Sequence, residues 1–150
     1  MKKLSFILFL LRVITGILFI YSGYSKLMAP RADFIGAILG YQIVGAQTAS
    51  WMAAIFPWIE LVAGVFFILG LWTRPALWVL WGLNAMFMVA ILSALLRRIP
   101  LENCGCFGEG AKALPVQATL ALDVFLFFVF FWMNRKKEEA SYFSFDRFFN

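Results

Sequence analysis

The side chains best suited to chemistry in this chain are two cysteines separated by one glycine, in the run Cys104-Gly105-Cys106-Phe107-Gly108. The chain has no other cysteine and no histidine, so its thiol chemistry rests on this pair alone. Cysteines two positions apart reach the usual disulfide Cα separation, roughly 4.4–6.8 Å, only on a bent backbone. Gly105 permits such a bend because it lacks a Cβ atom. The pair is therefore a candidate redox centre.

A catalytic role fits this pair better than a structural one. A disulfide that closes so small a ring adds little stability, because stabilisation by loop closure grows with loop length. Strained and exposed disulfides also have the more oxidising potentials that suit exchange. Arg97, Arg98 and Lys112 flank the pair and could stabilise a thiolate, although two nearby glutamates oppose this effect. We expect Lys26 to reach the same membrane face.

Two other interpretations of the cysteines stay open. The first is a local disulfide or a pair of thiols without turnover. The second is metal binding, because two thiolates suit Cu(I) or help to hold zinc. A closed zinc site needs four ligands, and the chain has no histidine to complete one or to ligate haem. Met86 and Met88 could act as soft ligands, but methionine at this spacing more often serves packing. The favoured interpretation therefore has no metal site, and metal binding by the two thiolates stays an alternative.

The composition indicates a protein of the membrane. The chain is 63% hydrophobic and 14% charged, whereas a soluble domain is nearer half apolar and a quarter charged. So much apolar surface cannot be hidden in one small core, so lipid must be the solvent for much of it. The net charge of +5 is spread over the ends of segments, which is typical of membrane flanks and not of a nucleic-acid surface.

Four apolar runs predict an all-α fold, a bundle of four transmembrane helices. They cover about residues 4–24, 51–72, 76–96 and 116–133, and each is near the roughly 20 residues that a spanning helix needs. Between the first two, Pro30 and Asp33 suit the start of a helix and Gly40 its end, so we expect a short helix lying in the membrane interface. A tight turn is expected at residues 73–75.

The order of the spans predicts one domain, residues 1–134, and a basic, aromatic tail, residues 135–150. An even number of spans puts both termini on one side. Basic residues on that side are Lys2, Lys3, Arg74, Arg135, Lys136 and Lys137, against Lys26, Arg31, Arg97, Arg98 and Lys112 on the other. The small excess favours termini on the cytoplasmic side of the membrane, with the tail there too. The cysteine loop would then face the outer side, where disulfides persist.

Three charged residues lie inside predicted spans: Arg12, Glu60 and Asp123. Each would cost about 2.5–3.5 kcal/mol if it faced lipid at mid-membrane, so we expect them to face the bundle interior and to pair as one network. The network could serve as a proton path or polar pocket beside the cysteines. It could equally be a clamp that fixes the register of the helices.

Small and polar residues in the spans are expected to serve helix packing. Asn84 is expected to form an interhelical hydrogen bond. The glycines expected to let helices approach closely are Gly16, Gly23, Gly64, Gly70 and Gly82.

Three blocks of residues resemble a known family. They are Arg12-x3-Gly16-x2-Phe19-x2-Ser22-Gly23-x2-Lys26-Leu27, then Pro57-Trp58-x-Glu60-Leu61-x2-Gly64, then Asn103-Cys104-Gly105-Cys106-Phe107-Gly108. Together they resemble the DoxX-like superfamily of four-helix membrane proteins, and specifically its MauE-type, redox-associated branch. The resemblance covers roughly residues 8–132. An aspartate is common just before the first cysteine of that block, where this chain has Asn103.

The resemblance implies an inner-membrane protein that works with periplasmic thiol chemistry. MauE is implicated in the maturation of methylamine dehydrogenase, whose small subunit is rich in disulfides, alongside a thioredoxin-like partner. We carry over the thiol–disulfide role and not the enzyme that it serves.

These inferences predict electron transfer through Cys104 and Cys106 between a periplasmic thioredoxin-like protein and another carrier. A membrane quinone is the natural small carrier, because the chain offers no ligands for a metal cofactor. The alternatives are a non-catalytic membrane scaffold for assembly or maturation of a redox enzyme, and a metal carrier that uses the two thiolates. Residues expected to support the site are Arg12, Lys26, Glu60, Arg97, Arg98 and Asp123.

Overall fold

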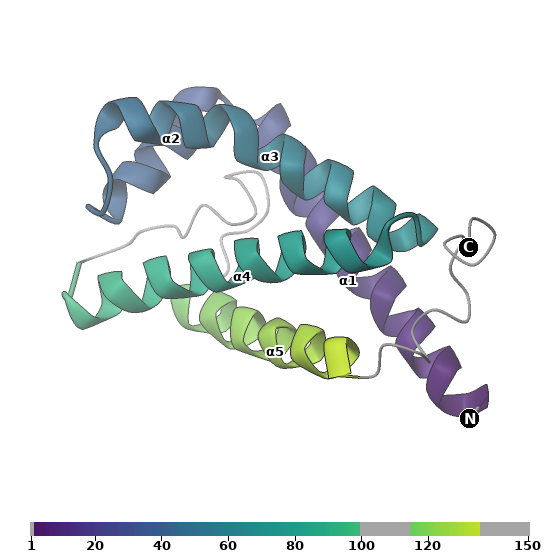
Figure 1. Cartoon of the computed structure of the whole chain (residues 1–150). Helices are drawn as coiled ribbons and strands as arrows, with labels where there is room; N and C mark the ends of the chain where they lie inside the picture. Colours follow the sequence, from purple (N-terminus) through teal and green to yellow (C-terminus); the bar gives the residue numbers. More distant parts are fainter. Residues whose placement is uncertain (1, 100–114, 136–150) are drawn as a thin grey trace.

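The structure is a computed structural model that describes residues 2–99 and 115–135. These residues form five α-helices and no strand: α1 (Lys2–Met28), α2 (Arg31–Gly40), α3 (Ala46–Leu69), α4 (Thr73–Leu96) and α5 (Val116–Arg135). All but α2 are long and apolar enough to cross a membrane. The prediction of an all-α, four-span bundle with a short helix between its first two spans is confirmed (Figure 1).

The closest helix packing joins α1 to α3, and glycines make it possible. A Cβ atom added to Gly16 would lie 3.2 Å from the carbonyl oxygen of Gly64, and one added to Gly64 would lie 3.0 Å from that of Gly16. A Cβ atom on Gly23 would meet the carbonyl oxygen of Pro57 at 2.7 Å. The backbones are thus too close for larger side chains, as expected where membrane helices associate through small residues. Gly82 on α4 differs, because a Cβ atom there would meet none of the described residues within 4 Å.

The apolar core is centred on Phe130 of α5, which is fully buried. Its ring lies 6.0 Å from that of Phe19 on α1 and 6.1 Å from that of Phe67 on α3, between ring centroids. Leu80 of α4 belongs to the same buried cluster. Aromatic pairs at such separations add to the energy of burial. All four long helices therefore meet around one core.

The α3–α4 turn lies at residues 70–72, so the predicted turn at 73–75 is wrong. Gly70 ends α3 in the left-handed conformation, with φ of 71°, and the N–H of Leu71 donates to the carbonyl of Phe66 at 3.0 Å. This is the Schellman pattern that glycine favours. Trp72 follows with φ of 51°, and residues 73–75 begin α4. Proline is tolerated so early in a helix because its missing N–H would have no partner there.

Helix α2 packs on the first half of α3. Phe34 and Ile38 form its buried face and lie against Ala49 and Ala53. The apolar face predicted for this segment is therefore real, and it is turned toward protein. Its placement in a membrane interface stays a prediction.

The end of α4 and the start of α5 lie together with the end of α2. Ile91 and Ala94 of α4 pack with Tyr41, which follows α2, and with Val116 and Leu120 of α5. This is the end of the bundle at which the chain segment 100–114 leaves α4 and returns to α5. Cys104 and Cys106 belong to that segment and lie outside the described residues.

Candidate functional site

A buried ion pair joins α1 to α3. The Nζ atom of Lys26 lies 2.6 Å from Oε1 and 2.9 Å from Oε2 of Glu60. The hydroxyl of Ser22 donates to Oε2 at 2.9 Å. The two charged side chains are 1% and 0% exposed. Ser22 and Lys26 can hold the same carboxylate because residues four apart share one face of a helix.

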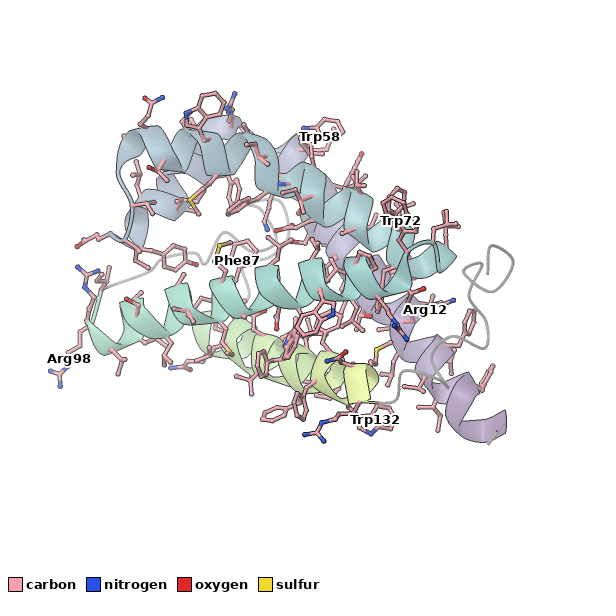
Figure 2. All side chains as sticks on the ribbon, in the orientation of Figure 1. Arg12, Trp58, Trp72, Phe87, Arg98 and Trp132 are labelled. Carbon is pink, nitrogen blue, oxygen red and sulfur yellow. The ribbon has the colours of Figure 1, made fainter. Side chains whose placement is uncertain are left out.

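Aromatic rings from two further helices cover the ammonium group. The Nζ atom of Lys26 lies 4.5 Å from the ring centroid of Phe87 on α4 and 5.2 Å from that of Phe34 on α2. Figure 2 shows Phe87 on the edge of α4 that faces α2 and α3. A cation this close to an aromatic face is attracted by the ring quadrupole. Helices α1 to α4 therefore all contribute to this charged pair.

The prediction that Arg12 pairs with Glu60 and Asp123 in one network is wrong, because the cation beside Glu60 is Lys26. Arg12 is buried, at 2% exposed, but it precedes Lys26 by 14 positions on α1. That spacing corresponds to about 21 Å along the helix axis. Since Glu60 lies beside Lys26, Arg12 is too far away to reach its carboxylate. Arg12 lies instead near Phe9, 5.4 Å from the ring centroid, toward the other end of the bundle from Arg98 (Figure 2). Glu60 takes its positive charge from Lys26.

A second polar pair joins α4 to α5. The side-chain amide Nδ2 of Asn84 donates to Oδ1 of Asp123 at 3.2 Å. Asn84 is 1% and Asp123 is 8% exposed, so the bond lies inside the bundle. The expected interhelical hydrogen bond of Asn84 is thereby confirmed. The other amide atom, Oδ1 of Asn84, is buried and has no hydrogen-bond partner among the residues that the structure describes.

Both polar pairs border one small cavity of about 30 Å³. Its polar lining consists of Ser22, Lys26, Glu60, Asn84 and Asp123, and its apolar lining of Leu18, Phe19, Phe87, Leu122 and Leu126. Sequence reasoning gave Ser22 and Phe87 no role in a site. The four-residue spacing of Ser22 and Lys26 was the available signal for Ser22, whereas nothing local marks Phe87. The cavity brings together three of the predicted supporting residues, Lys26, Glu60 and Asp123.

Arg97 and Arg98 stand at the exposed end of α4, away from this cavity. The guanidinium of Arg97 donates to the carbonyl of Gln42 at 3.1 Å and to that of Tyr41 at 3.5 Å, which ties α4 to the link after α2. Arg98 has a left-handed backbone, with φ of 55°. A role for either arginine beside the cysteines stays a prediction. Across residues 2–99 and 115–135, no three His, Cys, Asp or Glu side chains gather as a metal site would require.

Comparison with known proteins gives one family. The family model described as methylamine utilisation protein MauE matches residues 4–134. The match spans all four membrane-capable helices and the cysteine segment between α4 and α5. No curated protein and no solved structure matches the chain. The wider resemblance to DoxX-like proteins stays a prediction.

Proposed function

Because the chain belongs to the MauE family of multi-pass membrane proteins, we propose that it transfers electrons by thiol–disulfide exchange through Cys104 and Cys106. Family membership indicates a redox process or one related to methylamine utilisation. The exchange partner is a periplasmic thioredoxin-like protein, and a membrane quinone is the second carrier. The observation that carries the proposal is the glycine-spaced pair, the chain's only cysteines, in the connection between two membrane helices.

The exchange conserves atoms and electrons. A thiolate of one protein attacks the disulfide of the other and forms a mixed disulfide, and a second thiolate then resolves it. One protein ends as a disulfide and the other as a dithiol, so two electrons and two protons have passed between them. Reaction of the Cys104–Cys106 dithiol with a quinone would move the same two electrons and two protons and give a quinol.

The arrangement of the helix ends supports this proposal. The connection that carries the cysteines leaves and rejoins the bundle at the end where α2 covers α3. Arg97 and Arg98 lie at its first attachment point and are exposed. Since the Arg97 guanidinium is bonded to two backbone carbonyls, Arg98 is the stronger candidate for stabilising a thiolate.

We propose a bacterial inner-membrane topology with cytoplasmic termini and a periplasmic cysteine loop. A reporter that is active only in the periplasm tests it when fused after Gly110 or after Arg135. The first fusion should be active and the second silent. The reverse result would put the thiols in the cytosol, where a stable disulfide is not expected.

Trapping a mixed disulfide in cells tests the redox role. Cys106→Ser leaves Cys104 able to form a mixed disulfide but removes the thiol of this chain that would resolve it, and Cys104→Ser does the same for Cys106. A covalent adduct with a thioredoxin-like protein should accumulate and disappear on reduction. We expect more adduct when Cys104 remains, because it is nearer to Arg97 and Arg98.

The double serine variant is the matched control for trapping. It should insert into the membrane and unfold at the same midpoint as the parent, because the helices and not the cysteines hold the bundle together. It should give no adduct. If neither single variant forms an adduct while both insert normally, the redox proposal fails. The non-catalytic scaffold would then be the better interpretation.

A further inference from the structure

The buried oxygen of Asn84 needs a hydrogen-bond donor that the described residues do not supply. Its Nδ2 atom is used by Asp123, which fixes the amide, and its Oδ1 atom has no partner there. A buried acceptor without a partner is destabilising, because it has lost its hydrogen bonds to water and gained none in the protein. Asn84 is 1% exposed and lines the cavity between the two polar pairs. Something in that cavity should therefore donate to it.

The size of the cavity decides which ligand it takes. It measures about 30 Å³. One water needs at least about 10–15 Å³ on this measure, whereas an engineered cavity that binds benzene is about 150 Å³. The ring of a quinone is therefore far too large, and one or two water molecules fit.

We propose that this cavity is a water-binding site inside the membrane bundle, between α1, α3, α4 and α5. Buried waters typically make about two to four hydrogen bonds, and the lining offers an acceptor for each of the two protons of a water. A water can donate one proton to Oδ1 of Asn84 and the other to a carboxylate oxygen of Asp123 or Glu60.

Two waters in this cavity, hydrogen-bonded to each other, would connect two carboxylates that lie on different helix pairs. Glu60 belongs to the α1–α3 contact and Asp123 to the α4–α5 contact. Whenever Asp123 is protonated, it can pass its proton to the adjacent water and take another from it, so that the carboxyl group exchanges its proton with water. This role is independent of the cysteines and of the function proposed above.

Nuclear magnetic resonance of the full-length protein in lipid nanodiscs tests the site. With asparagine labelled by ¹⁵N, the side-chain amide of Asn84 is identified by its loss in Asn84→Leu. Magnetisation should transfer from water to this amide in the parent. Leu126→Phe, which fills the cavity, should abolish the transfer and keep the amide signal. Leu92→Phe is the matched control, because that leucine is 46% exposed on α4. It should leave both the transfer from water and the amide signal of Asn84 unchanged.

A second filling variant, Leu122→Phe, covers the case in which Leu126→Phe does not fold. The proposal is overturned if the parent shows no transfer from water, or if the transfer survives in the filled variants that fold. It is also overturned if the amide receives magnetisation from lipid acyl or quinone ring protons in place of water. None of these results bears on mixed-disulfide trapping.

Discussion

The two buried polar pairs border the same cavity but are built differently. Glu60 accepts three hydrogen bonds from α1, two of them from Lys26, and two aromatic rings cover the ammonium group. Asn84 donates to Asp123 at 3.2 Å, and its Oδ1 atom has no hydrogen-bond partner among the residues that the structure describes. Both oxygens of Glu60 already accept hydrogen bonds from α1, so the Lys26–Glu60 pair suits a structural clamp, whereas Asn84 of the second pair can still accept from a ligand. The first pair therefore stabilises the contact between α1 and α3, whereas the second can bind a ligand between α4 and α5.

The helices that carry the two pairs also differ in how closely their backbones approach their neighbours. The clamp lies where glycines bring the backbones of α1 and α3 together, with Gly23 directly beside Pro57 and Glu60. On α4, by contrast, a Cβ atom on Gly82 would touch no other part of the chain that the structure describes. Burying a charge is expensive unless its partner is fixed in good geometry, and a tight backbone contact fixes it.

Removing one member of the clamp should have the largest effect. Glu60→Leu leaves the ammonium of Lys26 buried without its carboxylate, which typically costs about 3–5 kcal/mol. Chemical unfolding in detergent micelles measures the loss. Replacing both residues, as Lys26→Met with Glu60→Leu, should restore most of the stability, because no charge is then buried. A single variant as stable as the parent would mean that the pair is no clamp.

Widening the α1–α3 contact should have the next largest effect. Gly23→Ala puts a Cβ atom 2.7 Å from the carbonyl oxygen of Pro57, a backbone atom that cannot turn away. Overpacking of this kind costs about 1–3 kcal/mol. Gly82→Ala is the matched control, and it should be neutral or stabilise by up to about 1 kcal/mol, because alanine favours a helix. Equal unfolding midpoints for the two variants would contradict the close packing.

The hydrogen bond between α4 and α5 should contribute least. A double-mutant cycle with Asn84→Ala and Asp123→Ala should give a coupling near the average of roughly 0.6 kcal/mol for polar pairs in membrane helices. Unfolding of the parent, the two single variants and the double variant supplies the four free energies. A coupling as large as that of the clamp would remove the distinction between the two pairs.

Much of the fold could be predicted because it depends on local properties. Long apolar runs predicted the four spans. Small residues predicted close helix packing at Gly16, Gly23 and Gly64, and the structure shows that the helices in contact there are α1 and α3. The turn after α3 was misplaced because the glycine end signal at Gly70 was passed over in favour of Pro75.

The clamp could not be identified in the same way. Lys26 lies two residues before the end of α1, where a lysine usually extends to the membrane surface. Its burial depends on rings from α2 and α4, which are brought to it only by the tertiary fold. The pairing of Arg12 with Glu60 was predicted wrongly for the same reason, because the residue of α1 that meets Glu60 depends on how α1 and α3 are aligned in the fold. The cysteine pair, which lies outside the described residues, stays a prediction from sequence.

The redox state of Cys104 and Cys106 in native membranes tests the central claim most directly. Sequential alkylation labels any thiols first with one reagent and then, after reduction, with a second of different mass. We predict that a substantial fraction of the protein takes up the second reagent on both cysteines and none of the first, which indicates a disulfide open to exchange. Complete labelling of both cysteines by the first reagent, in membranes prepared without reductant, would contradict the proposed role.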